Sequence, residues 1–151
     1  MKDTPLYVKS HQRNVGDEIM NGIFRIMLVV NLGLYLAWFI FPYSYKYWVS
    51  EESLQLLSYS GFEAFFIAPE STYWVMFAIT ACNLVGLFFY VNVCRSLFLV
   101  LLIVNLISQM TAGLTIYTGV ESGILNVSLI FDGVLLAMMY LTTVSLSFKK
   151  I

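Results

Sequence analysis

The sequence predicts an all-α integral membrane protein, a bundle of four transmembrane helices in one domain covering residues 1–151. Of these residues, 60% are hydrophobic and only 11% are charged, whereas a soluble domain carries about 25% charged residues. Four long stretches also contain almost no charged residues, namely 26–45, 71–94, 96–120 and 122–148. About 20 apolar residues cross ~30 Å of hydrocarbon, so each stretch is long enough to span a bilayer. We place the spans at 22–41, 73–94, 96–117 and 123–146.

The first span follows a polar, charged segment, and no small-residue cleavage site closes it, so we expect it to remain in the protein rather than act as a signal peptide. Arg25 lies at its beginning. The guanidinium can reach the lipid headgroups while its aliphatic stem stays in hydrocarbon, which is the interpretation we favour. The alternative is an arginine that binds a substrate.

The loop 42–72 separates the first two spans, and its middle predicts a short amphipathic helix. Ser50 can cap the start of this helix, and two glutamates follow it. Leu54 and Leu57 share one face, and Gly61 is a stop signal. We expect this helix to lie on the outer membrane surface over the mouth of the bundle.

The same loop is rich in aromatic residues, which have two interpretations. Tyr and Trp favour the membrane interface, so an aromatic belt explains most of them. The alternative is a surface that binds a partner protein, because this is the only sizeable segment outside the lipid. The candidate partner residues are Tyr47, Trp48, Tyr59 and Phe62.

Strongly polar side chains occur at similar depth in all four spans. The set comprises Asn31, Asn83, Asn105, Ser108, Gln109 and Asp132. An unpaired amide or carboxyl costs several kcal/mol in hydrocarbon, so we expect these groups to face one another near the midplane. If the last two spans form a close antiparallel hairpin, Ser108 and Gln109 lie opposite Asp132. We expect this hairpin to be the tightest contact of the bundle.

Asp132 is the only acidic residue inside a span. We expect a structural role, in which it hydrogen-bonds to Asn105 or Gln109. The alternative is a proton or cation site, because acidic groups in a membrane are functional candidates by default.

The positions of Lys and Arg predict an N-in/C-in topology. All of them except Lys46 lie in the N-terminal segment, near Arg95 between the second and third spans, or in the C-terminal tail. The loop 42–72 carries Lys46 against four glutamates. Positively charged flanks stay on the inner side, and an even number of spans returns the chain to it.

Several classes of site are not expected. A net charge of -1 offers no basic face for nucleic acid. The only histidine lies in the N-terminal segment, so no metal or haem site is predicted, and no nucleotide or hydrolase motif is present. Cys82 and Cys94 both fall on the second predicted span, about 120° apart, and we expect buried, inert thiols. We therefore predict no cofactor and no catalytic residue.

Two segments carry a resemblance to a group of known proteins. They are Leu56–Phe62 (LLSYSGF) and Phe131–Leu141 (FDGVLLAMMYL). The arrangement resembles small bacterial inner-membrane proteins of four spans, whose last helix has a D-G-x-x-L-A-x-x-Y pattern. The resemblance implies the architecture and a bacterial inner membrane, and no activity.

Four functions remain open. The first is an accessory subunit or assembly factor that binds another membrane or outer-side protein, or forms a homo-oligomer. A narrower form of it is an immunity protein against a toxin that attacks the membrane. The third is a small transporter or channel that uses the polar layer around Asp132. An enzyme acting on lipid comes last.

Overall fold

Four helices of the structure are long and apolar enough to cross a membrane. The first runs from Val15 to Trp48 and includes most of α1 (Pro5–Ile40), and the others lie within α4 (Glu70–Phe88), α5 (Asn92–Thr111) and α6 (Gly119–Leu141). The shorter helices are η1 (Phe41–Ser44), α2 (Tyr45–Trp48), α3 (Glu51–Leu57) and α7 (Val144–Ser147). The computed structural model describes residues 5–65 and 69–148, with side chains for 15–65, 69 and 71–148. This part of the chain is helical apart from turns, extended links and an isolated β-bridge.

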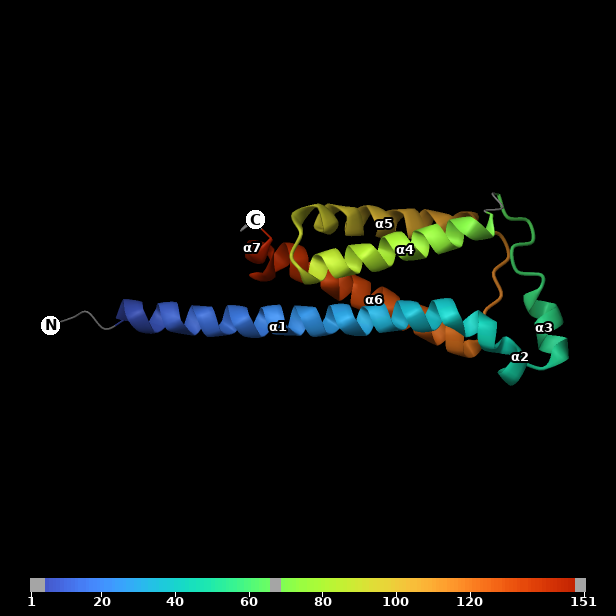
Figure 1. Ribbon diagram of the computed structural model, residues 1–151, viewed down its shortest axis with the longest axis horizontal. Coiled ribbons are helices and arrows are strands. Elements are labelled where there is room, and N and C mark those ends of the chain that lie inside the picture. The colour runs from blue at the N-terminus through green and yellow to red at the C-terminus, as the bar shows by residue number, and fades with distance from the viewer. Residues whose placement is uncertain (1–4, 66–68, 149–151) are drawn as a thin grey trace.

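Helix α1 is much longer than its apolar part. Its 36 residues make a helix of about 54 Å at 1.5 Å per residue, whereas the hydrocarbon core is ~30 Å thick. Its first turns project beyond the other helices (Figure 1). α7 and the turn between α4 and α5 lie at one end of the bundle, which we call the α7 end. α2 and α3 lie at the other, the loop end (Figure 1).

The predicted short helix is confirmed as α3. The Ser50 hydroxyl accepts a hydrogen bond from the Ser53 N–H at 3.4 Å, and Glu51 and Glu52 occupy the first turn. Acidic groups there favour the positive end of the helix dipole. Gly61 follows with a φ of 88°, a left-handed conformation that glycine adopts without strain.

At the loop end, the segment 58–65 is joined to the segment 112–118 by backbone hydrogen bonds. The Gly61 N–H donates to the Leu114 carbonyl at 2.7 Å, and the Leu114 N–H donates to the Phe62 carbonyl at 2.9 Å. Gly113, with a φ of 70°, allows this approach, because a Cβ there would collide with the Phe62 carbonyl and the Ala64 backbone. The two connecting segments therefore form one docked unit.

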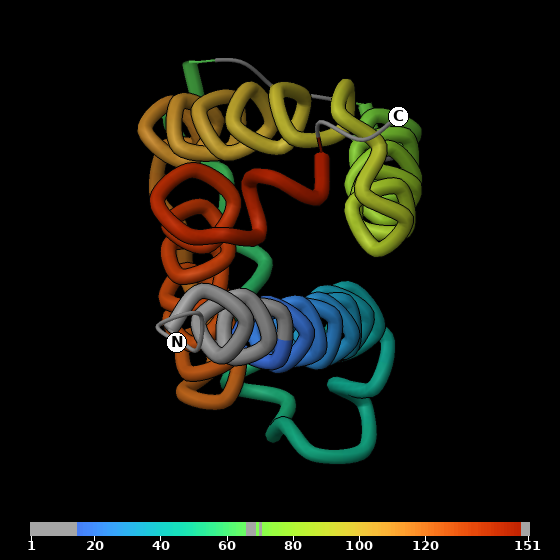
Figure 2. Tube along the Cα trace, turned by 90° about the vertical axis from the view of Figure 1, so that its left-hand side faces the viewer, coloured from blue at the N-terminus to red at the C-terminus, as the bar shows by residue number. Residues whose placement is uncertain are grey.

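The helices do not pack in sequence order. α1 makes its most extensive contacts with α6 and also packs on α4, while α4 packs on α5. Figure 2 shows α5 on the side of the molecule opposite α1. The expectation that the last two spans form the tightest contact was wrong, because α5 and α6 touch only slightly. The docked segment 112–118, rather than a tight turn, connects α5 to α6.

Three helices also end earlier than predicted, among them α6, which ends at Leu141 rather than at residue 146. α4 ends at Phe88 rather than at residue 94, and α5 ends at Thr111 rather than at residue 117. The first break is the turn 89–91, where Tyr90 has a φ of 58°. Arg95 consequently lies in the first turn of α5 and not between the helices.

An aromatic cluster closes the α7 end. The buried rings of Phe24 from α1 and Phe148 beside α7 meet edge to face at 6.1 Å between centroids. Tyr90 contacts both of them, with centroids 5.9 Å from Phe24 and 5.4 Å from Phe148. Aromatic pairs at such distances stabilise by about 0.5–1.5 kcal/mol beyond area burial. The cluster holds the turn 89–91 and α7 against α1.

Candidate functional site

The candidate site is a polar contact in the middle of the α1–α6 interface. The two helices run in opposite directions (Figure 1) and meet along stripes in which buried residues alternate in steps of three and four. Among the described side chains of α1 the buried residues are Phe24, Leu28 and Asn31, and on α6 they include Ser128, Asp132, Leu135 and Met139. This spacing keeps one face of each helix against its partner, as in coiled coils. Asn31 and Asp132 are both buried within these stripes, so their contact is shielded from the surroundings.

The carboxylate of Asp132 accepts hydrogen bonds from two side chains of α1. The Asn31 amide Nδ2 donates to Oδ1 at 2.8 Å, and the Tyr35 hydroxyl donates to Oδ2 at 2.9 Å. Asn31 is 0% exposed and Asp132 is 2% exposed. Asn31 and Tyr35 are four residues apart, so they project from the same face of α1. Together the three side chains clamp α1 to α6, and both carboxylate oxygens are engaged within the protein.

Other polar atoms near this clamp lack a hydrogen-bond partner among the described residues. They are Oδ1 of Asn31, Oγ of Ser128 and Nε1 of Trp38. Ser128 precedes Asp132 by one turn on α6, and Trp38 follows Tyr35 by one turn on α1. Buried polar groups are costly unless they are hydrogen-bonded. The two helices thus carry a polar stripe that extends from Asp132 toward the loop end.

The structure brings together only part of the predicted midplane layer. Asn31 and Asp132 are in direct contact. Asn105 and Gln109 lie half-buried on α5, and the Ser108 hydroxyl donates to the Val104 carbonyl of its own helix at 2.8 Å. The expected partners of Asp132, Asn105 or Gln109, are therefore replaced by Asn31 and Tyr35. The physical reason is that α6 packs on α1 rather than on α5.

Asn83 lies elsewhere, in a groove between α4 and α5. It is 2% exposed, and neither amide atom has a hydrogen-bond partner among the described residues. The groove has a volume of about 320 Å³ and is also lined by Cys82 and Cys94. Contrary to prediction, the two cysteines lie on different helices, and Cys82 is exposed. The helix break after Phe88 explains this, because it places Cys94 on α5.

Tyr35 is the member of the clamp that sequence reasoning missed. Tyrosines favour the membrane interface, which is why Tyr35 is absent from the predicted midplane layer. The signal was present in the stripe of Phe24, Leu28, Asn31 and Tyr35, which follows steps of four, three and four on one face. A tyrosine in such a stripe, one turn from an asparagine, indicates a buried hydroxyl that needs a partner.

The described part of the chain contains no group of three His, Cys, Asp or Glu side chains that could hold a metal ion. The candidate partner residues lie at the loop end, where all four are exposed. The exposed fractions are 72% for Tyr47, 80% for Trp48, 60% for Tyr59 and 63% for Phe62. Comparisons with protein families, with curated proteins and with solved structures find no match to this chain.

Proposed function

We propose that this protein is a non-catalytic membrane protein that binds another membrane or outer-side protein through its loop end, as an accessory subunit or assembly factor. The observation that carries the proposal is the exposure of Tyr47, Trp48, Tyr59 and Phe62. α2 and α3, which carry or adjoin these residues, lie at the loop end (Figure 1). Aromatic residues dominate the energetics of many protein interfaces, because each offers a large contact area at low entropic cost.

The docked loops support this function. A surface that is already ordered loses less conformational entropy when it binds a partner. The segment with Tyr59 and Phe62 is tied to 112–118 by backbone hydrogen bonds, including one from the Leu114 N–H to the Phe62 carbonyl at 2.9 Å. The part of the proposed partner surface that Tyr59 and Phe62 form is thus held in place before binding.

The surroundings of Asp132 favour this proposal over transport. A transport site exposes its ionisable group to a path that ions or protons can enter. Here the carboxylate is buried and accepts hydrogen bonds from Asn31 and Tyr35. The grooves described on this molecule are lined almost entirely by apolar side chains and do not include Asp132.

The orientation and location belong to the same proposal. With the N-in/C-in topology that the Lys and Arg positions favour, the loop end faces outward, and α3 lies at the outer surface of a bacterial inner membrane. In that orientation the partner is a protein of the outer side or of the membrane itself. A membrane-directed toxin is the narrower case, and a toxin gene beside the gene for this protein would favour it.

Co-purification from mildly solubilised membranes tests the function. We expect a stoichiometric partner that is lost when Tyr47 and Trp48 are both replaced by Ser. The matched control is Leu141→Ser, which changes a residue of similar exposure, 83%, away from the loop end. A homomeric species with the wild-type chain, or a partner that both variants retain, would refute the proposal.

A further inference from the structure

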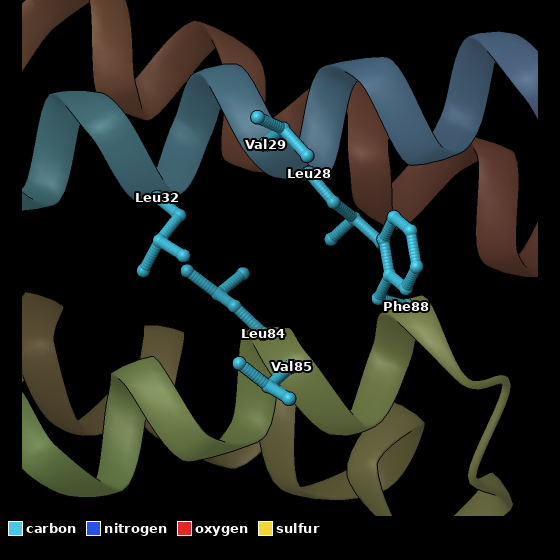
Figure 3. Close-up of a pocket in the computed structure, with 6 residues that line it drawn as sticks. All are labelled: Leu28, Val29, Leu32, Leu84, Val85 and Phe88. Carbon is cyan, nitrogen blue, oxygen red and sulfur yellow. The ribbon is translucent and has the colours of Figure 1, made fainter.

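Arg25 lies one turn before an apolar groove between α1 and α4. The groove is lined by Leu28, Val29 and Leu32 of α1 and by Leu84, Val85 and Phe88 of α4 (Figure 3). Leu28 and Leu84 are each 2% exposed, whereas Val29 and Val85 are 60% and 47% exposed. The buried leucines therefore form a floor, and the valines form rims that face the surroundings.

The arginine is held at one end of this groove. Its guanidinium lies over the ring of Phe88, 5.2 Å from the centroid, and over the ring of Tyr90, at 5.1 Å. Phe88 is itself part of the groove lining. Arg25 is exposed, so its N–H groups remain available to an anion while the rings restrict the position of the guanidinium.

Tyr90, whose ring lies beside Arg25, carries no charge of its own. Burial raises the pKa of the Tyr90 hydroxyl, and the nearby Arg25 only partly opposes this. Tyr90 thus stays neutral at physiological pH, and its hydroxyl donates to the Asn21 carbonyl at 3.4 Å. Arg25 therefore presents its positive charge at this end of the groove beside the uncharged ring of Tyr90.

We infer that this groove binds an anionic phospholipid, with the phosphate on Arg25 and part of one acyl chain between α1 and α4. The positive charge of Arg25 at one end of the groove complements the phosphate of such a lipid. The apolar lining of the groove suits its acyl chain. The groove volume is about 140 Å³, close to the roughly 150 Å³ apolar cavity that accepts one benzene. It therefore holds a short stretch of one chain rather than a whole lipid tail. The inference requires membrane insertion but is independent of the proposed protein partner.

Native mass spectrometry of the purified full chain, titrated with phosphatidylglycerol or phosphatidylcholine, tests the inference. We expect the first phosphatidylglycerol to bind about fivefold more tightly than phosphatidylcholine, the contribution of about one cation to an anionic lipid. Arg25→Gln should abolish this preference. Val85→Trp, which fills the groove from its exposed rim, should weaken the binding of both lipids.

The matched control is Arg95→Gln. Arg95 also lies near the α7 end, but its guanidinium stacks on Tyr140, 3.9 Å from the ring centroid. This variant should keep the preference of the wild type. Equal losses for Arg25→Gln and Arg95→Gln would indicate diffuse charge attraction and overturn the inference. Unchanged binding by Val85→Trp, or full competition by glycerol 3-phosphate, would overturn the role of the groove. Circular dichroism verifies that each variant is folded.

Discussion

The α1–α6 pair and the α4–α5 pair are held together by different kinds of contact. α1 and α6 are far apart in the sequence, yet they share a long interface with the Asp132 clamp at its centre. α4 and α5 are neighbours joined by a short turn, and on α5 only Phe98 is buried among the described core. In a membrane, lipid solvates apolar side chains as well as protein does, so polar groups and close backbone approach determine which helices pair. The first pair uses a polar clamp, and the second uses a glycine.

The glycine is Gly86 on α4. A Cβ at this position would collide with the Sγ of Cys94 on α5, and the Cβ of Cys94 would lie 3.3 Å away. Gly86 and Cys94 are separated by the turn 89–91, so their contact closes the hairpin. Small residues at helix interfaces let backbones approach in this way.

The largest predicted effect is the loss of the clamp. Asp132→Ala removes the acceptor of both hydrogen bonds and leaves the Asn31 amide and the Tyr35 hydroxyl unpaired. We expect the free energy of unfolding to fall by about 2 kcal/mol, measured by denaturant titration in detergent. For Asp132→Asn, which keeps one acceptor oxygen, the free energy of unfolding should fall by less. Equal stability of Asp132→Ala and wild type would show that the clamp does not hold α1 to α6.

The second effect concerns the α4–α5 pair. Gly86→Ala should lower the free energy of unfolding by about 1 kcal/mol, because the new methyl group meets the Cys94 sulfur. The double variant Gly86→Ala with Cys94→Ala should recover part of this loss, since the colliding atom is removed. Gly133→Ala is the control, because nothing lies within 4 Å of a Cβ built at that glycine. Losses of the same size at both glycines would indicate a general helix effect instead of a specific contact.

A smaller effect is expected for Tyr35→Phe, which removes a single hydrogen bond of the clamp. Interhelical hydrogen bonds in membranes contribute about 0.6 kcal/mol on average, and the same loss is expected here. In the Asp132→Ala background the substitution should have no further effect, because the two residues act as a pair. Tyr73→Phe, at a residue of α4 with an exposed side chain, is the matched control. If Tyr35→Phe destabilised equally in both backgrounds, the hydroxyl would act through some other contact.

The smallest effect separates the structure from the sequence-based hypothesis. Asn105→Ala and Gln109→Ala, on α5, should change the free energy of unfolding by less than about 0.5 kcal/mol, the range of surface substitutions without a specific contact. The same denaturant titration measures it. A loss comparable to that of Asp132→Ala would place these amides in the clamp and contradict the α1–α6 interface.

Local features of the sequence were enough to predict which segments form helices and roughly where these helices lie in the chain. The four helices that can span a membrane lie where charge is scarce, and Ser50 was recognised as the cap at the start of α3. The ends of α4 and α5 could not be predicted as well. They depend on the left-handed conformation of Tyr90 and on the docking of Gly113 against Phe62. Neither contact is visible in hydropathy, since both arise when distant backbone segments meet.

The sequence by itself determined that the chain is built from four long apolar helices and that Asp132 is a polar group needing a partner. Only the tertiary structure decided which partner it has. Depth along a helix follows from counting residues, so Asn31, Asn83, Asn105 and Asp132 could all be assigned to similar depths. Rotation about the helix axis and the choice of neighbour depend on the packing of every side chain along the interface. The continuous stripe shared by α1 and α6 therefore selected Asn31 and Tyr35, and left the amides of α4 and α5 outside the clamp.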